Sequence, residues 1–299
     1  KDVIPKLPLG WTCKTFNAFG LGMVKQHYPY AKVDFLKYSR NNYSHPSAHA
    51  LVSKHMCMNG NISETSWKTT CDRFKINYSY IKEAQELLAR GQEDTNVISG
   101  DDMLQYPIEN GWKSNKYEIV LIDECQDLNP QQIEFLTCIP TERIVFVGDI
   151  NQAIYGFRGS DPYAMDKIRD HYNPTDYELT ETFRCPQEIL TTVKHIVPNI
   201  FSKKTNGQVI TEGNMLNINY PDECFIISRT NSNLVRLAYK FIQENKHFSI
   251  GGTFITQLKK DLNKVFNGCT SLTEMQENVV TQYEREITRA KGNKWSITG

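Results

Sequence analysis

The stretch that decides the fold runs from Tyr117 to Asp149, YEIVLIDECQDLNPQQIEFLTCIPTERIVFVGD. Two runs in it, Tyr117–Ile122 and Arg143–Asp149, are short and almost continuously apolar, as strands of a parallel sheet buried on both faces are. The apolar spacing between the two runs predicts one helix, which ends at Pro140. A strand, a helix and a strand within about 30 residues make a βαβ unit. We therefore expect an α/β fold with a parallel sheet.

Acidic side chains follow both predicted strands. Asp123 and Glu124 come directly after the first strand, and Asp149 ends the second. Because ligands of open α/β sheets bind at the carboxyl ends of the strands, chemistry is expected at this edge. One carboxylate of the Asp-Glu pair can hold Mg²⁺, and the other can orient or deprotonate an attacking water. The alternative is that the two acids only begin a helix, where negative charge is favoured.

The alternation of apolar runs and amphipathic stretches resumes later in the chain. Apolar runs at Tyr177–Phe183, Cys224–Thr230 and Phe248–Thr253 are predicted to be strands, and helical periodicity lies between them. A second parallel-sheet domain is therefore expected to begin near residue 174.

Residues 25–115 differ in composition from the flanking sequence. They lack clear buried strands, and residues 64–91 have helical character. Between Lys25 and Gln92 there are ten Lys and Arg residues against five Asp and Glu residues, with nine aromatic residues. Such a stretch can form a basic, aromatic face for nucleic acid. The simpler interpretation is that aromatic residues at helical spacing form a core, and taken alone this stretch favours that interpretation.

Composition excludes several classes of protein. The chain of 299 residues is 39% hydrophobic and 23% charged, which is typical of a globular protein of two or three domains. Its net charge of zero excludes a uniformly basic nucleic-acid coat but leaves room for a local basic groove. No apolar run has the length of a membrane span, and the first residues lack the apolar core of a signal peptide. The eight cysteines are dispersed without a C-x-x-C pair, so reduced thiols and a cytoplasmic location are expected.

Several short motifs together are more specific than the acidic pair alone. The chain resembles the UvrD/Rep-like superfamily 1 helicases through DECQD (123–127), GDINQAIYGFRGSD (148–161), ETFRC (181–185), TFNAFG (15–20), GDDMLQYP (100–107), SRTN (228–231) and GGTF (251–254). The first of these matches the family's Walker B motif, with Cys125 where alanine is usual. Asn17 stands where the family usually has histidine.

The resemblance implies a fold and a domain organisation. It implies P-loop NTPase (RecA-like) motor domains with parallel sheets and a mostly helical inserted subdomain. Residues 1–24 and 116–173 would form part of the first motor domain, and residues 25–115 the helical insertion. Residues 174–299 would form part of the second motor domain.

The resemblance also implies roles in binding and hydrolysing ATP. Asp123 would hold Mg²⁺, and Glu124 would be the catalytic base for water. Gln152 would hydrogen-bond the attacking water and a γ-phosphate oxygen, and so sense hydrolysis. Arg184 would reach the γ-phosphate from the second motor domain, because a guanidinium stays charged and binds phosphate in a bidentate way. Phe183, where the family usually has tyrosine, would stack on adenine.

Further residues are implied to contact single-stranded DNA. Tyr155, Phe157 and Arg158 would face the strand, since stacking on aromatic rings tolerates any base sequence. Phe16 and Asn17 are additional candidates for contact with DNA. The alternatives are that Tyr155 and Phe157 belong to the core and that Arg158 pairs with a nearby acid.

The resemblance implies an ATP-driven DNA helicase or translocase that moves 3′ to 5′ on single-stranded DNA, unwinds duplex junctions and has no membrane partner. The family's GxxxxGK[ST] loop does not occur in the chain, and its fifth and sixth motifs are not found either. We therefore expect a truncated piece of a longer enzyme, with little ATPase activity on its own. Two alternatives are a non-hydrolysing module that binds single-stranded DNA or a protein partner, and a metal-dependent nuclease that uses Asp123, Glu124 and Asp149.

Overall fold

A computed structural model of the chain describes residues 7–38, 45–58, 67–153, 161, 163–211, 213–228 and 231–249, and residues 271, 273, 274, 277 and 281. The chain divides into two compact units, Lys1–Thr205 and Asn206–Gly299. Among the described residues, no helix has the length and apolar composition needed to cross a membrane. The described cysteines of both units are free thiols.

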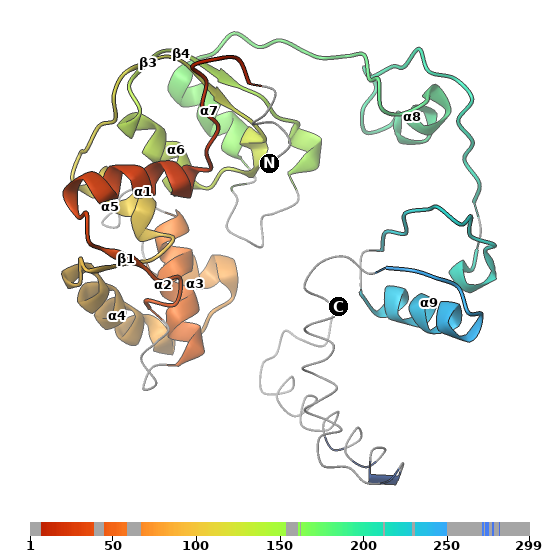
Figure 1. The fold of residues 1–299 in the computed structure, drawn as a ribbon, viewed down its shortest axis with the longest axis horizontal. Helices are drawn as coiled ribbons and strands as arrows, with labels where there is room; N and C mark the ends of the chain where they lie inside the picture. The colour runs from red at the N-terminus through yellow and green to blue at the C-terminus, as the bar shows by residue number, and fades with distance from the viewer. Residues whose placement is uncertain are drawn as a thin grey trace. The chain divides into compact units, whose positions relative to one another are not determined.

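The predicted βαβ unit is present in the first unit (Figure 1). Strands β3 (Tyr117–Ile122) and β4 (Thr141–Phe146) pair in parallel, with Ile122 opposite Phe146. The connection contains helix α6 (Pro130–Phe135) and a short 3-10 turn, η4 (Leu136–Cys138). A capping box of Asn129 and Gln132 fixes the start of α6.

One face of this sheet is covered by helix α7 (Ala164–Tyr172), whose Ile168 packs with Ile122 and Phe146. On the opposite face Leu121 is 52% exposed and Val145 is 36% exposed. The expectation that both strands are buried on both faces is therefore wrong for these positions. The described sheet has only these two strands, and α7 shields the alternate side chains that face it.

Helices α1 (Phe16–His27) and α5 (Asp102–Glu109) pack closely beside α6. Gly20 of α1 lets the two helices α1 and α5 come close together, because a Cβ atom at Gly20 would lie 2.2 Å from the carbonyl oxygen of Met103 in α5. Val24, Met103 and Ile98 share one core that also holds a small parallel sheet of β1 (Lys32–Val33) and β2 (Val97–Ile98). Phe135 of α6 is fully buried against α1 and α5.

A separate core joins three further helices, which are neighbours in Figure 1: α2 (Pro46–Met58), α3 (Trp67–Phe74) and α4 (Ile81–Glu93). The helical character expected for residues 64–91 is confirmed where these residues are described. It is divided between α3 and α4, because Lys75 adopts a left-handed conformation (φ 55°) after α3. Asn77 then caps the 3-10 turn η2 (Tyr78–Tyr80) that precedes α4.

After α7 the chain has less regular structure. A parallel bridge between Glu181 and Phe201 flanks helix α8 (Gln187–Val193). The second unit contains the 3-10 turn η7 (Met215–Asn217) and helix α9 (Asn231–Gln243), with Leu237 and Phe241 buried.

The strands expected in this later part are not observed among the described residues. Residues 177–183 contribute one bridge rather than a strand. The prediction of a buried strand at Cys224–Thr230 is wrong for its described positions, because Phe225 is 100% exposed and Ile227 is 91% exposed. A buried parallel strand needs neighbouring strands, and the described part of the second unit has none. Most of Phe248–Thr253 lies outside the described residues.

A buried ion pair links the β1–β2 region to α5. Lys37 Nζ lies 2.9 Å from Asp102 Oδ2, and their side chains are 5% and 0% exposed. Asp102 also accepts hydrogen bonds from the Tyr38 hydroxyl (2.6 Å) and the Ser99 backbone N–H (2.9 Å). Burial, followed by the negative charge of Asp102, raises the pKa of the Tyr38 hydroxyl. Lys37 Nζ also donates to the Asp94 carbonyl and the Tyr106 hydroxyl (3.1 Å each), but of these partners only Asp102 carries a negative charge.

We predict that Asp102→Asn lowers the free energy of unfolding by about 3–5 kcal/mol, because it leaves the Lys37 ammonium buried without its counter-charge. Urea denaturation followed by tryptophan fluorescence measures the change. Glu142→Gln is the matched control, since Glu142 pairs with Lys116 on the surface (59% and 62% exposed), and it should change stability by less than about 1 kcal/mol. Equal effects of the two substitutions would contradict the prediction.

Candidate functional site

The acidic residues singled out from the sequence meet at one edge of the β3–β4 sheet. The backbone N–H of Val147 donates to the Ile122 carbonyl (2.8 Å), and the N–H of Cys125 donates to the Val147 carbonyl (2.9 Å). These two bonds continue the strand pairing beyond the ends of the strands. The turn that carries Glu124 is thereby joined to the turn that carries Asp149.

Gln126 connects the two turns through its side chain. It is 2% exposed, its Nε2 donates to Glu124 Oε2 (2.7 Å), and its Oε1 accepts from the Asp149 backbone N–H (3.1 Å). Because a backbone N–H can only donate, the atom facing Asp149 must be the amide oxygen. The amide NH₂ group therefore faces the Glu124 carboxylate.

Asp149 extends the array to Gln152. The Asp149 side chain begins the 3-10 turn η5 (Ile150–Gln152) by accepting from the Asn151 N–H (2.9 Å), and its second oxygen accepts from Gln152 Nε2 (2.9 Å). The predicted base and the predicted sensor of hydrolysis thus belong to one hydrogen-bonded series, Glu124–Gln126–Asp149–Gln152, called the edge array below.

Sequence reasoning did not single out Gln126. The available signal was its place as the fourth letter of DECQD, where an uncharged polar side chain lies among three acids shortly after a predicted strand. A buried amide in such a place needs partners at both of its ends. The identity of those partners depends on how the second strand is registered against the first.

Glu124 occupies an unusual backbone conformation. Its φ of 52° and ψ of 42° are left-handed, which is uncommon for a residue with a side chain and recurs at functional sites. Its backbone N–H donates to Asp123 Oδ1 (3.0 Å), and both side chains are exposed. The structure thus presents two neighbouring carboxylates to solvent at the end of a strand.

The carboxylate of Asp123 suits Mg²⁺. Its Oδ2 atom accepts no hydrogen bond from the described residues, whereas Oδ1 is held by the backbone. Within the described ranges no group of three His, Cys, Asp or Glu residues is arranged to hold a metal ion. Mg²⁺ commonly binds through one or two carboxylates together with phosphate oxygens and waters, and Asp123 fits that kind of site.

Gly148 is required where the two turns touch. A Cβ atom at Gly148 would lie 2.5 Å from Gln126 Oε1 and 2.7 Å from Cys125 Sγ. Cys125 is 1% exposed, and burial raises the pKa of its thiol. Burial, followed by the charge of Glu124, also raises the pKa of the nearby Asp127. The packing leaves no space for a larger residue at position 148.

The other predicted site residues have contacts or exposure of their own outside the edge array. The Phe16 ring packs edge-on against Phe135 (centroids 6.3 Å apart), and Asn17 Nδ2 donates to the Gly100 carbonyl (2.6 Å). Phe183 is 80% exposed and Arg184 is exposed, in the turn before α8. Among the described residues, the hydrogen bond recorded for Arg184 runs from its backbone N–H to Thr182 Oγ1 (3.3 Å) and not to the array.

Tyr155, Phe157 and Arg158 lie outside the described residues, so their predicted contact with DNA remains a prediction. The acid that follows them, Asp161, pairs with Lys167 and accepts the Tyr163 backbone N–H (3.0 Å).

Some side chains of the basic, aromatic stretch between Lys25 and Gln92 hold the fold together. Lys37 is held by Asp102, and Lys25 Nζ donates to the Pro29 carbonyl (3.2 Å) and to the Ala31 carbonyl. Several of the aromatic rings are buried or packed in the cores, namely Tyr28, Tyr38, Trp67 and Tyr80. Others are open to solvent, with Tyr30 91% and Phe35 75% exposed. The stretch therefore contains both core residues and exposed rings.

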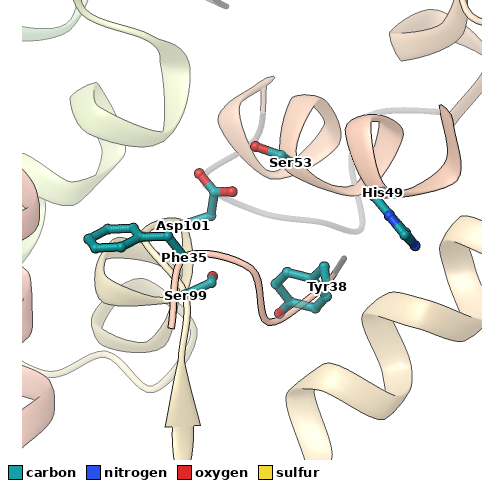
Figure 2. A pocket seen from close by; sticks show the side chains of 7 residues that line it. Phe35, Tyr38, His49, Ser53, Ser99 and Asp101 are labelled. Carbon is teal, nitrogen blue, oxygen red and sulfur yellow. The ribbon is translucent and has the colours of Figure 1, made fainter. Parts of the chain in front are cut away.

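A pocket of about 230 Å³ lies between α2 and the segment before α5, as Figure 2 shows. It is lined by Phe35, Tyr38, His49, Ser53, Ser99, Gly100 and Asp101. Asp101 Oδ1 accepts from the Cys57 thiol (3.7 Å), and burial together with the Asp101 charge raises the pKa of Cys57 to about 12. No member of the edge array lines this pocket.

Comparison with known proteins finds a class of proteins that the chain resembles. Residues 40–173 match the UvrD/REP helicase N-terminal domain family, a match that includes β3, β4 and the whole edge array. This family has a P-loop NTPase fold, and the structure is α/β with small parallel sheets. The resemblance to UvrD/Rep-like helicases is confirmed.

Individual relatives agree with this class. The chain is 28% identical over 129 residues to the probable DNA helicase II homolog of Mycoplasma pneumoniae, covering 38% of this chain and 18% of that protein. It is 37% identical over 95 residues to the mitochondrial ATP-dependent DNA helicase HMI1 of Saccharomyces cerevisiae, covering 30% and 13%. It is 37% identical over 92 residues to an ATP-dependent helicase/nuclease subunit from Carboxydothermus hydrogenoformans, covering 30% and 8%. The chain thus matches less than a fifth of each of these relatives.

We predict that Gly148→Ala lowers the thermal midpoint, because the added methyl group forces the two turns apart and overpacking costs about 1–3 kcal/mol. Gly22→Ala is the matched control, since a Cβ atom at this exposed position of α1 meets nothing within 4 Å. That substitution should leave the midpoint unchanged or raise it, because alanine favours a helix by about 1 kcal/mol. A Gly148→Ala midpoint equal to that of Gly22→Ala would contradict the packing described above.

Proposed function

We propose that these residues are part of an ATP-dependent DNA helicase that couples ATP hydrolysis to 3′-to-5′ movement on single-stranded DNA and to unwinding of duplex DNA. The observation that carries the proposal is the edge array, which hydrogen-bonds Glu124 to Gln152 through Gln126 and Asp149. It lies within the part of the chain that matches the helicase family. The three relatives described above are all named as DNA helicases or as a helicase/nuclease.

The proposed chemistry is attack of water on the γ-phosphate of ATP. When bound, Mg²⁺ would neutralise charge on the phosphates, and Asp123 is the residue proposed to hold it. Glu124 takes a proton from the attacking water, and its exposed carboxylate is oriented by the Gln126 amide. Gln152 has a neutral amide that both donates and accepts, so it suits contact with water and a phosphate oxygen together.

Arg184 and Phe183 are proposed to act from the segment after the first motor domain. Both side chains are exposed, and the Arg184 backbone N–H donates to Thr182 Oγ1 (3.3 Å) within the turn. An exposed guanidinium on a short turn is free to meet a phosphate group that binds beside it. This role requires residues 1–24 and 116–173 to act as one motor domain and residues 174–299 as part of the next.

The nuclease and the binding-module alternatives are not favoured. A nuclease centre would need the Asp149 carboxylate to face a metal ion, but both of its oxygens accept hydrogen bonds within its own turn. A module that only binds DNA has no physical requirement for a base hydrogen-bonded in series with a γ-phosphate sensor.

We predict that Glu124→Gln in the full-length protein that contains this sequence lowers the kcat of DNA-stimulated ATP hydrolysis by about 10²- to 10⁴-fold, because the base for water is removed. The affinity for ATP should persist, since the amide keeps the size of the carboxylate. Phosphate release and nucleotide binding measure the two effects. Glu118→Gln is the matched control, because Glu118 is exposed on the same strand, away from its carboxyl end.

Assays of the wild-type protein with labelled DNA also distinguish a helicase from a nuclease and from a DNA-binding module. Separation of a labelled partial duplex that requires ATP and Mg²⁺ supports the helicase. Shortened strands formed without ATP would identify a nuclease, and DNA binding without hydrolysis would identify a binding module. Either of the last two results would contradict the proposal.

We predict that the affinity of the 299-residue chain for single-stranded DNA falls with salt, by a slope of about 0.7 per phosphate contact in a plot of log affinity against log salt concentration. Fluorescence anisotropy of a labelled oligonucleotide measures this slope. Substituting Lys82 and Arg90 of α4, both exposed, with glutamine should flatten it. Lys116→Gln, before β3, is the matched control. A slope near zero for the unsubstituted chain would contradict a role of the basic stretch in binding DNA.

A further inference from the structure

The buried side chain of Gln126 faces both halves of the candidate site. A bond of 2.7 Å to Glu124 Oε2 and a bond of 3.1 Å from the Asp149 N–H use the two ends of the amide. Gly148 packs against the same amide oxygen, because a Cβ atom there would approach it to 2.5 Å. The amide is therefore held by the backbone of one turn and presented to a carboxylate on the other.

The direction of the Glu124 side chain depends on the groups around it. Its carboxylate is exposed, and its backbone is left-handed, so neither burial nor a regular helix fixes the direction of the side chain. Among the described residues, the Gln126 amide is the one group that donates a hydrogen bond to this carboxylate. A hydrogen bond to a charged acceptor is stronger than a neutral one, and it restricts which oxygen of Glu124 is turned toward solvent.

We propose that Gln126 is a positioning residue for hydrolysis: its amide fixes the carboxylate of Glu124 and the Asp149 turn that carries Gln152 in one geometry. This inference rests on the proposed function. Gln126 itself touches neither water nor nucleotide, and it acts through the two residues that do. A shift of the Asp149 turn moves Gln152, because Gln152 Nε2 is bound to the Asp149 carboxylate.

The test uses Gln126→Met in the full-length protein. Methionine matches the length and volume of glutamine but cannot make either hydrogen bond. We expect kcat to fall about 10- to 100-fold with little change in KM for ATP, because misplacement of a reacting group has effects of this size.

A second buried glutamine provides the matched control. Gln131 is 1% exposed, and its amide donates to Gln105 Oε1 (2.9 Å) and to the Asp101 carbonyl (3.2 Å), away from the edge array. Gln131→Met removes buried hydrogen bonds of the same kind, so it should lower stability while leaving kcat unchanged at a temperature where the variant is folded. A double variant, Gln126→Met with Gln152→Ala, should lose no more than the more damaging single variant, because the two residues act in one array.

The outcomes separate this inference from the proposed function. An unchanged kcat for Gln126→Met, equal losses of kcat for Gln126→Met and Gln131→Met, or additive losses in the double variant would each overturn the inference. If the wild-type protein hydrolyses ATP and Glu124→Gln does not, the proposed function stands even when Gln126→Met behaves as the wild type. If the wild-type protein does not hydrolyse ATP at all, the proposed function fails and the inference fails with it.

Discussion

The contact between two turns, one after β3 and one after β4, is the constraint on which the candidate site depends. Gly148 lets the second turn approach until its backbone touches the side chains of Cys125 and Gln126. The parallel register of the strands brings the turns to the same edge, and two backbone hydrogen bonds extend the pairing past the strand ends. A buried amide in this contact then links an exposed carboxylate to a polar turn twenty-five residues further along the chain (Glu124 and Asp149).

The sequence was most informative where local pattern and chemistry coincide. The apolar runs, the connecting helix and the acids at the strand ends were all predictable, because the period of the apolar residues and the parallel pairing follow from the same short stretch. The exposure of Leu121 and Val145 was not predictable. An apolar run does not reveal whether a layer covers each face, and here α7 covers only one.

The later part of the chain shows the limit of the same reasoning. The run at Cys224–Thr230 has the composition of a buried strand, yet Phe225 and Ile227 are exposed, since strand formation depends on partners that the run itself does not specify. Gln126 was missed for a related reason. Its importance comes from a contact across 23 residues with the Asp149 backbone, whereas its local sequence drew attention to the neighbouring acids. The same limit applies to the proposed roles of Arg184 and Phe183. Both residues lie on an exposed turn, and their roles depend on another surface that their local sequence does not specify.

We propose that ATP is hydrolysed at the carboxyl edge of β3 and β4, with Arg184 completing the site. The most direct measurement is a structure of the full-length protein bound to Mg²⁺, ADP and a trigonal or square-planar fluoride analogue of the transferring phosphoryl group. We expect the Glu124 carboxylate and the Gln152 amide within hydrogen-bonding distance of the water that lies in line with the fluoride analogue, Asp123 beside the metal, and the Arg184 guanidinium on the opposite side. A nucleotide bound elsewhere, with Glu124 and Arg184 on unrelated surfaces, would contradict this proposal.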